Sequence, residues 1–229
     1  MKKCISFSGQ SRFIKEGLKT LEKNLVDFDE YDIFIHTWEN EKSKDCFLYN
    51  TKKCIIEPQK EDIIPEESKN FDPLFFNDPR AFIHYSMFYS MKQSTLLKQN
   101  HEKENNFKYD AVIRTRFDIS LEDKIDIKKF NLRDGVFSPD VCGNKDVISD
   151  WFNFSTSENI DIYTTMYDEI LNMHKAGMNC FAGENIITKT LSKHKIKYNR
   201  FPCSLYLLRP KDFIIPHNGD YKIFWKNIE

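Results

Sequence analysis

Apolar and polar residues alternate along the first 58 residues in the pattern of an α/β fold. Three short runs are apolar on both faces, which predicts strands buried between helices. They span residues 3–9, 31–38 and 52–58. Between the first two runs, apolar residues recur every three or four positions, which predicts an amphipathic helix over residues 12–28. The apolar stripe of this helix consists of Ile14, Leu18, Leu21 and Leu25.

The middle of the chain predicts a long helix followed by a further strand. Residues 59–79 are acidic and contain several prolines, which indicates a loop with one short helix. Residues 80–100 carry small or apolar side chains at helical spacing. These side chains are Ile83, Met87, Ser90, Met91, Ser94 and Leu97. The next run, residues 109–119, predicts a buried strand that is apolar on both faces in its first half.

The second half of the chain mixes strands and helices. The predicted strands span residues 134–140, 146–157 and 197–209, and a helix spans residues 183–194. A longer helix is expected over residues 155–174, because Ser155 and Glu158 have the spacing of a capping box. The last 20 residues are expected to be irregular. The order of elements predicts a single α/β domain, with a largely parallel N-terminal sheet and a mixed C-terminal part.

Composition narrows the classes of function. The chain of 229 residues has 34 basic and 35 acidic side chains and a net charge of -1, which argues against a general nucleic-acid-binding surface. We therefore expect no nucleic-acid partner. The six cysteines are scattered, without a C-x-x-C pair or zinc-finger spacing, which is typical of free thiols in a reducing compartment.

No targeting or membrane segment is expected. The apolar run after the N-terminal Met-Lys-Lys breaks at Ser6, Ser8 and Gly9, too early for a signal peptide. No stretch reaches the roughly 20 apolar residues that span a bilayer, so no integral membrane segment is predicted. The expected location is the cytoplasm, or the host cytoplasm if the protein is viral.

The segment YDAVIRTRFDIS, residues 109–120, ends with charged residues in line. Side chains alternate along a strand, so Arg114, Arg116 and Asp118 are predicted on one face, about 6–7 Å apart. Burying such groups without partners is costly. Two interpretations are open: the arginines and the aspartate pair with one another, or they face a ligand.

The carboxyl ends of the predicted parallel strands favour the second interpretation. In open α/β sheets, ligands gather beyond those ends. Several polar residues are expected to share that rim. They are Ser8, Gly9 and Arg12 after the first strand, His36 in the second, and Arg116 and Asp118 at the end of the 109–119 strand. For Arg12, a solvent-exposed position at the start of a helix is an equally open interpretation. For His36, the simpler interpretation is that it only ends its strand.

Five segments together resemble a group of small nucleotide-sugar glycosyltransferases with the GT-A fold, which includes members from capsule loci and large viruses. They are SGQSR (8–12), YDIFIHTW (31–38), YDAVIRTRFD (109–118), DWFNFSTSENIDIYTTMY (150–167) and FAGENIITKTL (181–191). The third is similar to that group's Arg-x-Arg-x-Asp variant of the Asp-x-Asp motif. The resemblance extends from about residue 4 to about residue 208. It implies a nucleotide-sugar-binding half (1–119), an acceptor-side half (120–208) and a C-terminal tail (209–229).

The resemblance implies a donor site and a metal. Residues expected to contact the nucleotide or its phosphates are Ser8, Gly9, Arg12, Arg114 and Arg116. One arginine side chain can bind two phosphate oxygens at once. A hard divalent ion, Mn²⁺ or Mg²⁺, held by Asp118 would bridge the diphosphate. Arg116 replaces the first acid of Asp-x-Asp, so arginine is a second source of neutralising charge.

The acceptor-side half supplies candidates for the chemical step. If the anomeric configuration inverts, a carboxylate must accept the proton of the acceptor hydroxyl. Asp150, beside the apolar run WFNF, is the candidate base, and Glu184 is the candidate contact to the acceptor or donor sugar. Each also has a simpler interpretation: Asp150 as a turn residue, and Glu184 as an acid in the first turn of a helix. The tail IIPHNGDYKIFW is faintly similar to the metal-binding ending of some retaining GT-A enzymes, which makes His217 a second candidate ligand; a surface histidine is the simpler interpretation.

The expected function is transfer of a sugar from a nucleotide-sugar donor to a glycan or other hydroxyl acceptor, in surface-polysaccharide or viral glycan synthesis. Two other functions stay open. A nucleotidyltransferase-like enzyme could use the same rim, although the sequence has no glycine-rich phosphate loop. A non-catalytic carbohydrate-binding or interaction module could use the abundant aromatic residues. The nucleotide, the sugar, the acceptor and the oligomeric state are left open.

Overall fold

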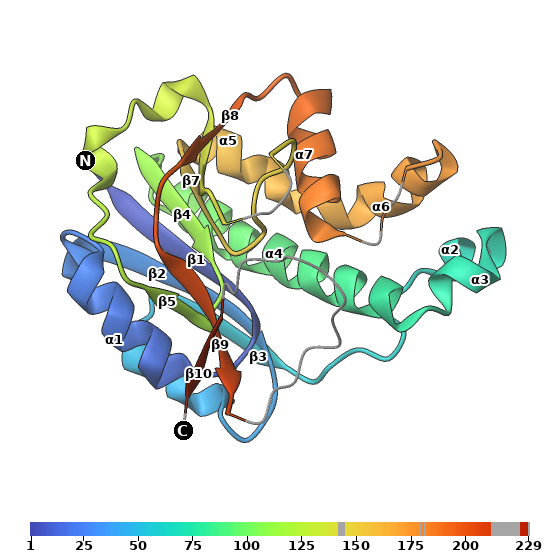
Figure 1. Cartoon of the computed structure of the whole chain (residues 1–229), viewed down its shortest axis with the longest axis horizontal. Helices are drawn as coiled ribbons and strands as arrows, with labels where there is room; N and C mark the ends of the chain where they lie inside the picture. Colours follow the sequence, from blue (N-terminus) through green and yellow to red (C-terminus); the bar gives the residue numbers. More distant parts are fainter. Residues whose placement is uncertain (142–144, 179, 181, 212–224, 229) are drawn as a thin grey trace.

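A seven-stranded sheet forms the centre of the fold (Figure 1). The computed structural model describes residues 1–141, 145–178, 180, 182–211 and 225–228. The strands are β1 (Lys3–Gln10), β2 (Tyr31–Trp38), β3 (Lys53–Glu57), β4 (Ala111–Thr115), β6 (Val136–Pro139), β7 (Phe152–Ser155) and β8 (Tyr198–Phe201), in the order β3-β2-β1-β4-β7-β6-β8. The first four run parallel, β7 is antiparallel to β4 and β6, and β6 is parallel to β8. This confirms an α/β fold with a sheet that is mostly parallel in its N-terminal part.

Helices cover both faces of this sheet (Figure 1). They are α1 (Ile14–Asn24), α2 (Glu66–Phe71), α3 (Pro73–Phe76), α4 (Pro79–Glu104), α5 (Ser157–Asp161), α6 (Met166–Lys175) and α7 (Gly183–Lys193), with 3-10 turns at Phe28–Glu30, Ser43–Tyr49, Ile127–Lys129, Leu132–Asp134 and Ile162–Thr164. One face packs on α1 and a three-stranded sheet of β5 (Ile119–Leu121), β9 (Leu205–Pro210) and β10 (Trp225–Ile228). The other packs on α4, α6 and α7. No helix within the described ranges is long and apolar enough to cross a membrane.

The alternation of side chains in β1 divides the core into two layers. Ile5 and Phe7 belong to the apolar cluster that contains Leu18 of α1. Cys4 points the other way, into the cluster that contains Phe88 of α4. Burying one large apolar side chain contributes about 1.5–3 kcal/mol, so two such layers hold the central strands firmly. The residues that follow β1 and β4 therefore start from fixed positions.

The prediction of one strand over residues 109–119 is wrong at its C-terminal end. β4 ends one residue before Arg116, and β5, directly after Asp118, belongs to the three-stranded sheet. The apolar Phe117 is fully buried in the layer that contains α1. Arg116 and Asp118 thus lie in a bend between two sheets and do not continue a strand face with Arg114.

Gly17 of α1 allows this bend to lie where it does. A Cβ atom at Gly17 would lie 2.1 Å from the carbonyl oxygen of Phe117, far inside van der Waals contact. Any side chain there would push α1 away from the bend. The glycine therefore fixes the bend that carries Arg116 and Asp118 against the first helix.

The predicted helix over residues 155–174 is three elements: α5, a 3-10 turn and α6. The predicted capping box is wrong, because the N-cap of α5 is Thr156, whose side chain accepts from the backbone N–H of Asn159 at 3.4 Å. Ser155 instead ends β7 and donates its hydroxyl to the carbonyl of Gly135 at 2.7 Å. The backbone carbonyl of Gly135, directly before β6, thus binds the side chain that the local pattern assigned to the helix cap.

Other boundaries also differ from the sequence-based expectations. The predicted strand over residues 197–209 is two strands, β8 and β9, which lie in different sheets on either side of Pro202. Only the end of the predicted strand over residues 146–157 forms a strand, β7. The loop over residues 59–79 contains two short helices, α2 and α3, and not one. The C-terminal region is not wholly irregular, because β10 pairs in parallel with β9.

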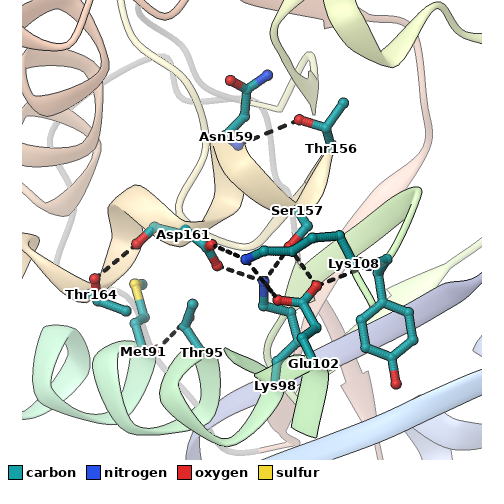
Figure 2. A network of polar contacts seen from close by, with 11 residues as sticks. Met91, Thr95, Lys98, Glu102, Lys108, Thr156, Ser157, Asn159, Asp161 and Thr164 are labelled. Carbon is teal, nitrogen blue, oxygen red and sulfur yellow. Dashed lines mark hydrogen bonds and ion pairs between the residues drawn. The ribbon is translucent and has the colours of Figure 1, made fainter. Parts of the chain in front are cut away.

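A charge network centred on the buried residues Lys98 and Glu102 lies at the amino end of β4 and is called the basal network here. It consists of Lys98, Glu102, Lys108, Ser157 and Asp161 (Figure 2). Lys98 is fully buried and donates to both carboxylates and to the serine. Glu102 also accepts from the second lysine at 3.0 Å and from the backbone N–H of Tyr109 at 2.9 Å. The network ties the C-terminal end of α4 to α5 and to the start of β4.

Candidate functional site at the carboxyl edge of the parallel strands

A cavity of about 230 Å³ opens beyond the carboxyl ends of β1, β2 and β4. All five residues that the sequence assigned to the donor site line it: Ser8, Gly9, Arg12, Arg114 and Arg116. The opposite wall comes from Trp38 at the end of β2 and from the first turns of α4. Because the carboxyl ends of parallel strands meet at one edge, residues about 100 positions apart in the chain form one surface.

Arg114 is the most unusual residue of this cavity. Its side chain is 1% exposed, and burial lowers the pKa of its guanidinium to about 10. It donates to the backbone carbonyl of Asp150 and, at 3.3 Å, to the hydroxyl of Ser8. Its Nε atom is buried without a hydrogen-bond partner, and among the residues that the structure describes no carboxylate lies within ion-pair distance. Arg114 is therefore a buried cation that no described carboxylate contacts directly, and the negative charge of Asp150 acts on it only from beyond ion-pair distance.

The turn after β1 is held in an unusual backbone conformation. Gly9 has φ of +110°, a region that residues with a side chain rarely adopt. Its N–H donates to the hydroxyl of Ser90 at 2.7 Å, and its carbonyl accepts from the hydroxyl of Thr37 at 2.8 Å. Both backbone groups of Gly9 are thus used inside the fold. The N–H of Gly9 is therefore not available to a ligand, whereas its carbonyl keeps a second lone pair.

His36 stabilises this turn from behind and does not reach the cavity. It is fully buried, and burial lowers its pKa, which keeps the ring neutral near pH 7. Nε2 lies 2.8 Å from Glu57 and Nδ1 lies 2.8 Å from Ser90. Since the ionised Glu57 can only accept, Nε2 carries the proton, and Nδ1 accepts from Ser90. Sequence reasoning placed His36 at the rim and missed Ser90 and Glu57, which lie 54 and 21 residues away in the chain.

Arg116 and Asp118 pair with each other, as the first of the two sequence interpretations expected. Nε of Arg116 donates to one carboxylate oxygen of Asp118 at 2.6 Å, and Nη2 donates to the other at 2.9 Å. Arg209 of β9 adds a third hydrogen bond to Asp118 at 2.8 Å. Burial raises the pKa of Asp118, and the two arginines lower it. The net result is a pKa below the usual value of an aspartate. Arg116 nevertheless lines the cavity, so pairing and ligand contact are compatible for this residue.

The expected divalent metal does not fit the described surroundings of Asp118. The side chain is 3% exposed, and both of its oxygens accept hydrogen bonds from arginine. No group of three or more histidine, cysteine, aspartate or glutamate residues that could hold a metal occurs among the residues that the structure describes. His217, the second candidate ligand, lies outside the described residues.

Asp150 and Glu184 come together beside the cavity, although they are 34 positions apart in the sequence. Burial, and next the negative charge of Asp150, raise the pKa of Glu184 to about 7. Asp150 is 8% exposed, and its Oδ1 atom is buried without a hydrogen-bond partner among the described residues. A Cβ atom at Gly183, the first residue of α7, would lie 3.5 Å from Oδ2 of Asp150 and 2.6 Å from Met87, a cavity residue. The start of α7 is therefore packed against both Asp150 and the cavity wall.

A second cavity, of about 560 Å³, adjoins the first. Arg12 lines both, and Phe13, Lys42 and Arg209 line the second. Phe13 has φ of +52°, in the left-handed region where a bulky residue is a strained outlier. Ligand pockets commonly measure about 300–1,000 Å³, so the two cavities together have room for a ligand of nucleotide-sugar size.

No model of a known protein family matches this chain, and no curated protein shows significant similarity to it. The resemblance to GT-A glycosyltransferases therefore stays a prediction.

Proposed function

We propose that this protein is a glycosyltransferase that moves a sugar from a nucleotide-sugar donor to a hydroxyl acceptor. The observation that carries the proposal is Arg114, a buried cation that lines the first cavity and has no carboxylate partner among the described residues. Burying an uncompensated charge is costly, so an anionic ligand is its natural counter-ion. Arg116 and Arg12 line the same cavity, and several arginines around one cavity match a diphosphate.

The alternative of a neutral carbohydrate-binding module has less support. Such a module needs exposed aromatic faces, and of the aromatic residues that line the first cavity Trp38 is only 2% exposed and Phe82 is partly buried. A neutral sugar also gives no reason to bury an uncompensated guanidinium. The arrangement of cations is that of a site for an anion.

The two carboxylates beside the cavity support a transferase over a site that only binds nucleotide. In the proposed reaction the bond between the anomeric carbon and the donor phosphate oxygen breaks, and the acceptor oxygen bonds to that carbon. The nucleoside diphosphate leaves with the bonding electrons, and the arginines stabilise its charge. If the configuration inverts, the proton of the acceptor hydroxyl passes to a carboxylate.

Glu184 suits the role of that base better than Asp150, which reverses the order of the sequence-based ranking. A base is most effective when its pKa lies near the working pH, and the pKa of Glu184 is raised to about 7. Glu184 is partly exposed, whereas Asp150 is buried. In this proposal Asp150 acts as a positioning residue: its backbone carbonyl orients Arg114, and its charge raises the pKa of Glu184.

Thermal unfolding with a panel of nucleotides tests the binding half of the proposal. We expect UDP, GDP or their sugar conjugates to raise the melting temperature of the wild-type protein. Arg114→Met should remove this stabilisation, while Arg133→Met, at an exposed arginine that borders neither cavity, should retain it. If no nucleotide stabilises the protein and a neutral glycan does, the binding-module alternative is correct.

Slow hydrolysis of sugar nucleotides tests the catalytic half without knowledge of the acceptor. We expect release of free sugar and nucleoside diphosphate from at least one donor. Release of inorganic pyrophosphate from a nucleoside triphosphate, with no donor hydrolysis, would indicate a nucleotidyltransferase and contradict the proposal.

A further inference from the structure

The bend between β4 and β5 contains a compact cluster of opposite charges, Arg116, Asp118 and Arg209. Asp118 accepts a paired hydrogen bond from Arg116 and a third bond from Arg209, at 2.6, 2.9 and 2.8 Å. The two arginines come from separate parts of the chain, the bend and β9. A guanidinium pairs with a carboxylate in a fixed planar geometry, so Asp118 holds both arginine heads in defined orientations.

This arrangement leaves little room for a cation at Asp118. Mg²⁺ and Mn²⁺ sites are built from carboxylate oxygens and usually retain water ligands. The Asp118 side chain is 3% exposed, and its oxygens already accept from three N–H groups. A metal could bind only if at least one arginine first moved away, and an arginine that stayed would place a positive group beside a divalent ion.

The same arrangement directs positive charge toward both cavities. Arg116 lines the first cavity, Arg209 lines the second, and Arg12 lines both. Asp118 uses only part of the N–H donors of Arg116, and the rest can bind a ligand. Together with Arg114, four arginines border the two cavities. Asp118 fixes the orientation of two of them, Arg116 and Arg209.

We propose that arginine replaces the divalent metal in this site: Arg12, Arg114, Arg116 and Arg209 bind the diphosphate, and Asp118 positions arginine and does not ligate an ion. The inference rests on the proposed function, because it describes how the same cavities bind the donor. It also gives a physical reason for an arginine at the position where an Asp-x-Asp motif has its first acid: a second arginine supplies the charge that the ion would bring.

Binding measurements with and without metal test the inference. The probes are UDP, GDP and inorganic pyrophosphate, titrated by calorimetry in buffer treated to remove metal and again with added MnCl₂ or MgCl₂. We expect at least one probe to bind in metal-free buffer, with a Kd that changes by less than about threefold when metal is added. Tightening by about tenfold or more with metal, or binding only with metal, would overturn the inference and leave the proposed function standing. Absence of binding by every probe in both buffers would overturn both.

A variant of Asp118, measured in the same two buffers, distinguishes a residue that positions arginine from a residue that ligates a metal. If Asp118 only positions arginine, Asp118→Asn weakens binding by the same factor with and without metal, about tenfold. If it ligates a metal, the loss occurs only when metal is present, which contradicts the inference. Arg116→Lys keeps the charge and loses the paired geometry, so it should weaken binding in metal-free buffer even if Asp118→Asn folds poorly. Asp29→Asn, at an exposed acid that borders neither cavity, is the matched control.

Discussion

Lys98 and Arg114 are both almost completely buried cations, 0% and 1% exposed, and they lie at opposite ends of the region around β4. Lys98 belongs to the basal network, where it contacts two carboxylates and a serine hydroxyl (Figure 2). Arg114 contacts a backbone carbonyl and a serine hydroxyl, and its Nε atom has no partner in the described part of the chain. One cation is paired directly with carboxylates, and the other has no carboxylate in contact among the described residues.

This difference distinguishes a buried charge that holds the fold together from a buried charge that is available to a ligand. A buried ion network with every partner present holds elements together, as the basal network holds α4, α5 and β4. A buried charge that the fold leaves uncompensated reduces stability and is retained where a ligand supplies the missing partner. The raised pKa of Glu184 has a related origin, because burial first, and next the negative charge of Asp150, disfavour its ionised form.

The largest effect should come from Glu184→Gln. If Glu184 accepts the proton, this change should lower kcat by about 10²–10⁴-fold, because that is the contribution of a general base, while nucleotide affinity stays close to that of the wild type. Steady-state kinetics with an identified donor and acceptor give the measurement. An unchanged kcat would mean that the enzyme retains configuration or that the base is another residue, and NMR of the anomeric product would decide between these cases.

Asp150→Asn tests which of the two acids is the base, because it removes the negative charge that, together with burial, raises the pKa of Glu184. The acid limb of the pH–rate profile should then move to lower pH, with a smaller loss of kcat at high pH than in Glu184→Gln. A loss of kcat as large as that of Glu184→Gln at every pH would assign the base to Asp150, as the sequence-based ranking had it.

A pair of methionine variants compares the two buried cations directly. Lys98→Met leaves Glu102 and Asp161 with Lys108 as their remaining lysine partner, so it should lower the free energy of unfolding by about 3 kcal/mol. For a chain of this size that corresponds to a decrease in Tm of about 6–12 °C. Arg114→Met removes a cation that no described carboxylate contacts directly, so it should change Tm much less, while it abolishes nucleotide binding. Equal losses of stability would contradict the distinction between the two regions.

The smallest expected effect is the pH dependence of stability that Glu184 contributes. Its pKa is raised in the folded state from 4.5 to about 7, so the folded protein binds the proton more tightly than the unfolded chain does. The resulting stability is present below about pH 4.5 and is lost as pH rises through about 7. Glu184→Gln stays neutral, so it should match the wild type at pH 4 and exceed it at pH 8, by about 1–2 kcal/mol after allowance for the partial exposure of the side chain. Chemical denaturation at the two pH values gives the comparison, and a variant no more stable than the wild type at pH 8 would contradict it.

Much of the fold could be predicted from the sequence because local patterns decide it. The apolar runs of β1 and β2 and the helical stripes of α1 and α4 each follow from side-chain spacing within a single element. That Ser8, Gly9, Arg12, Arg114 and Arg116 line one cavity was also predictable, since the carboxyl ends of parallel strands meet at one edge. The predictions failed where partners distant in the chain compete with the local pattern, as at Ser155, which binds Gly135 and does not cap a helix.

The sequence by itself determined the N-terminal elements β1, α1 and β2, the long helix α4, and the edge of the sheet at which the arginines gather. Only the tertiary structure decided which of the buried charges are compensated. Spacing predicted Arg114, Arg116 and Asp118 on one strand face, whereas the chain bends after β4, and Arg209, 91 residues beyond Asp118, completes the ion cluster. The physical reason is that spacing sets the direction of a side chain within its own element. The energy of a buried charge depends on every group that folding brings within a few ångströms of it, from any part of the chain.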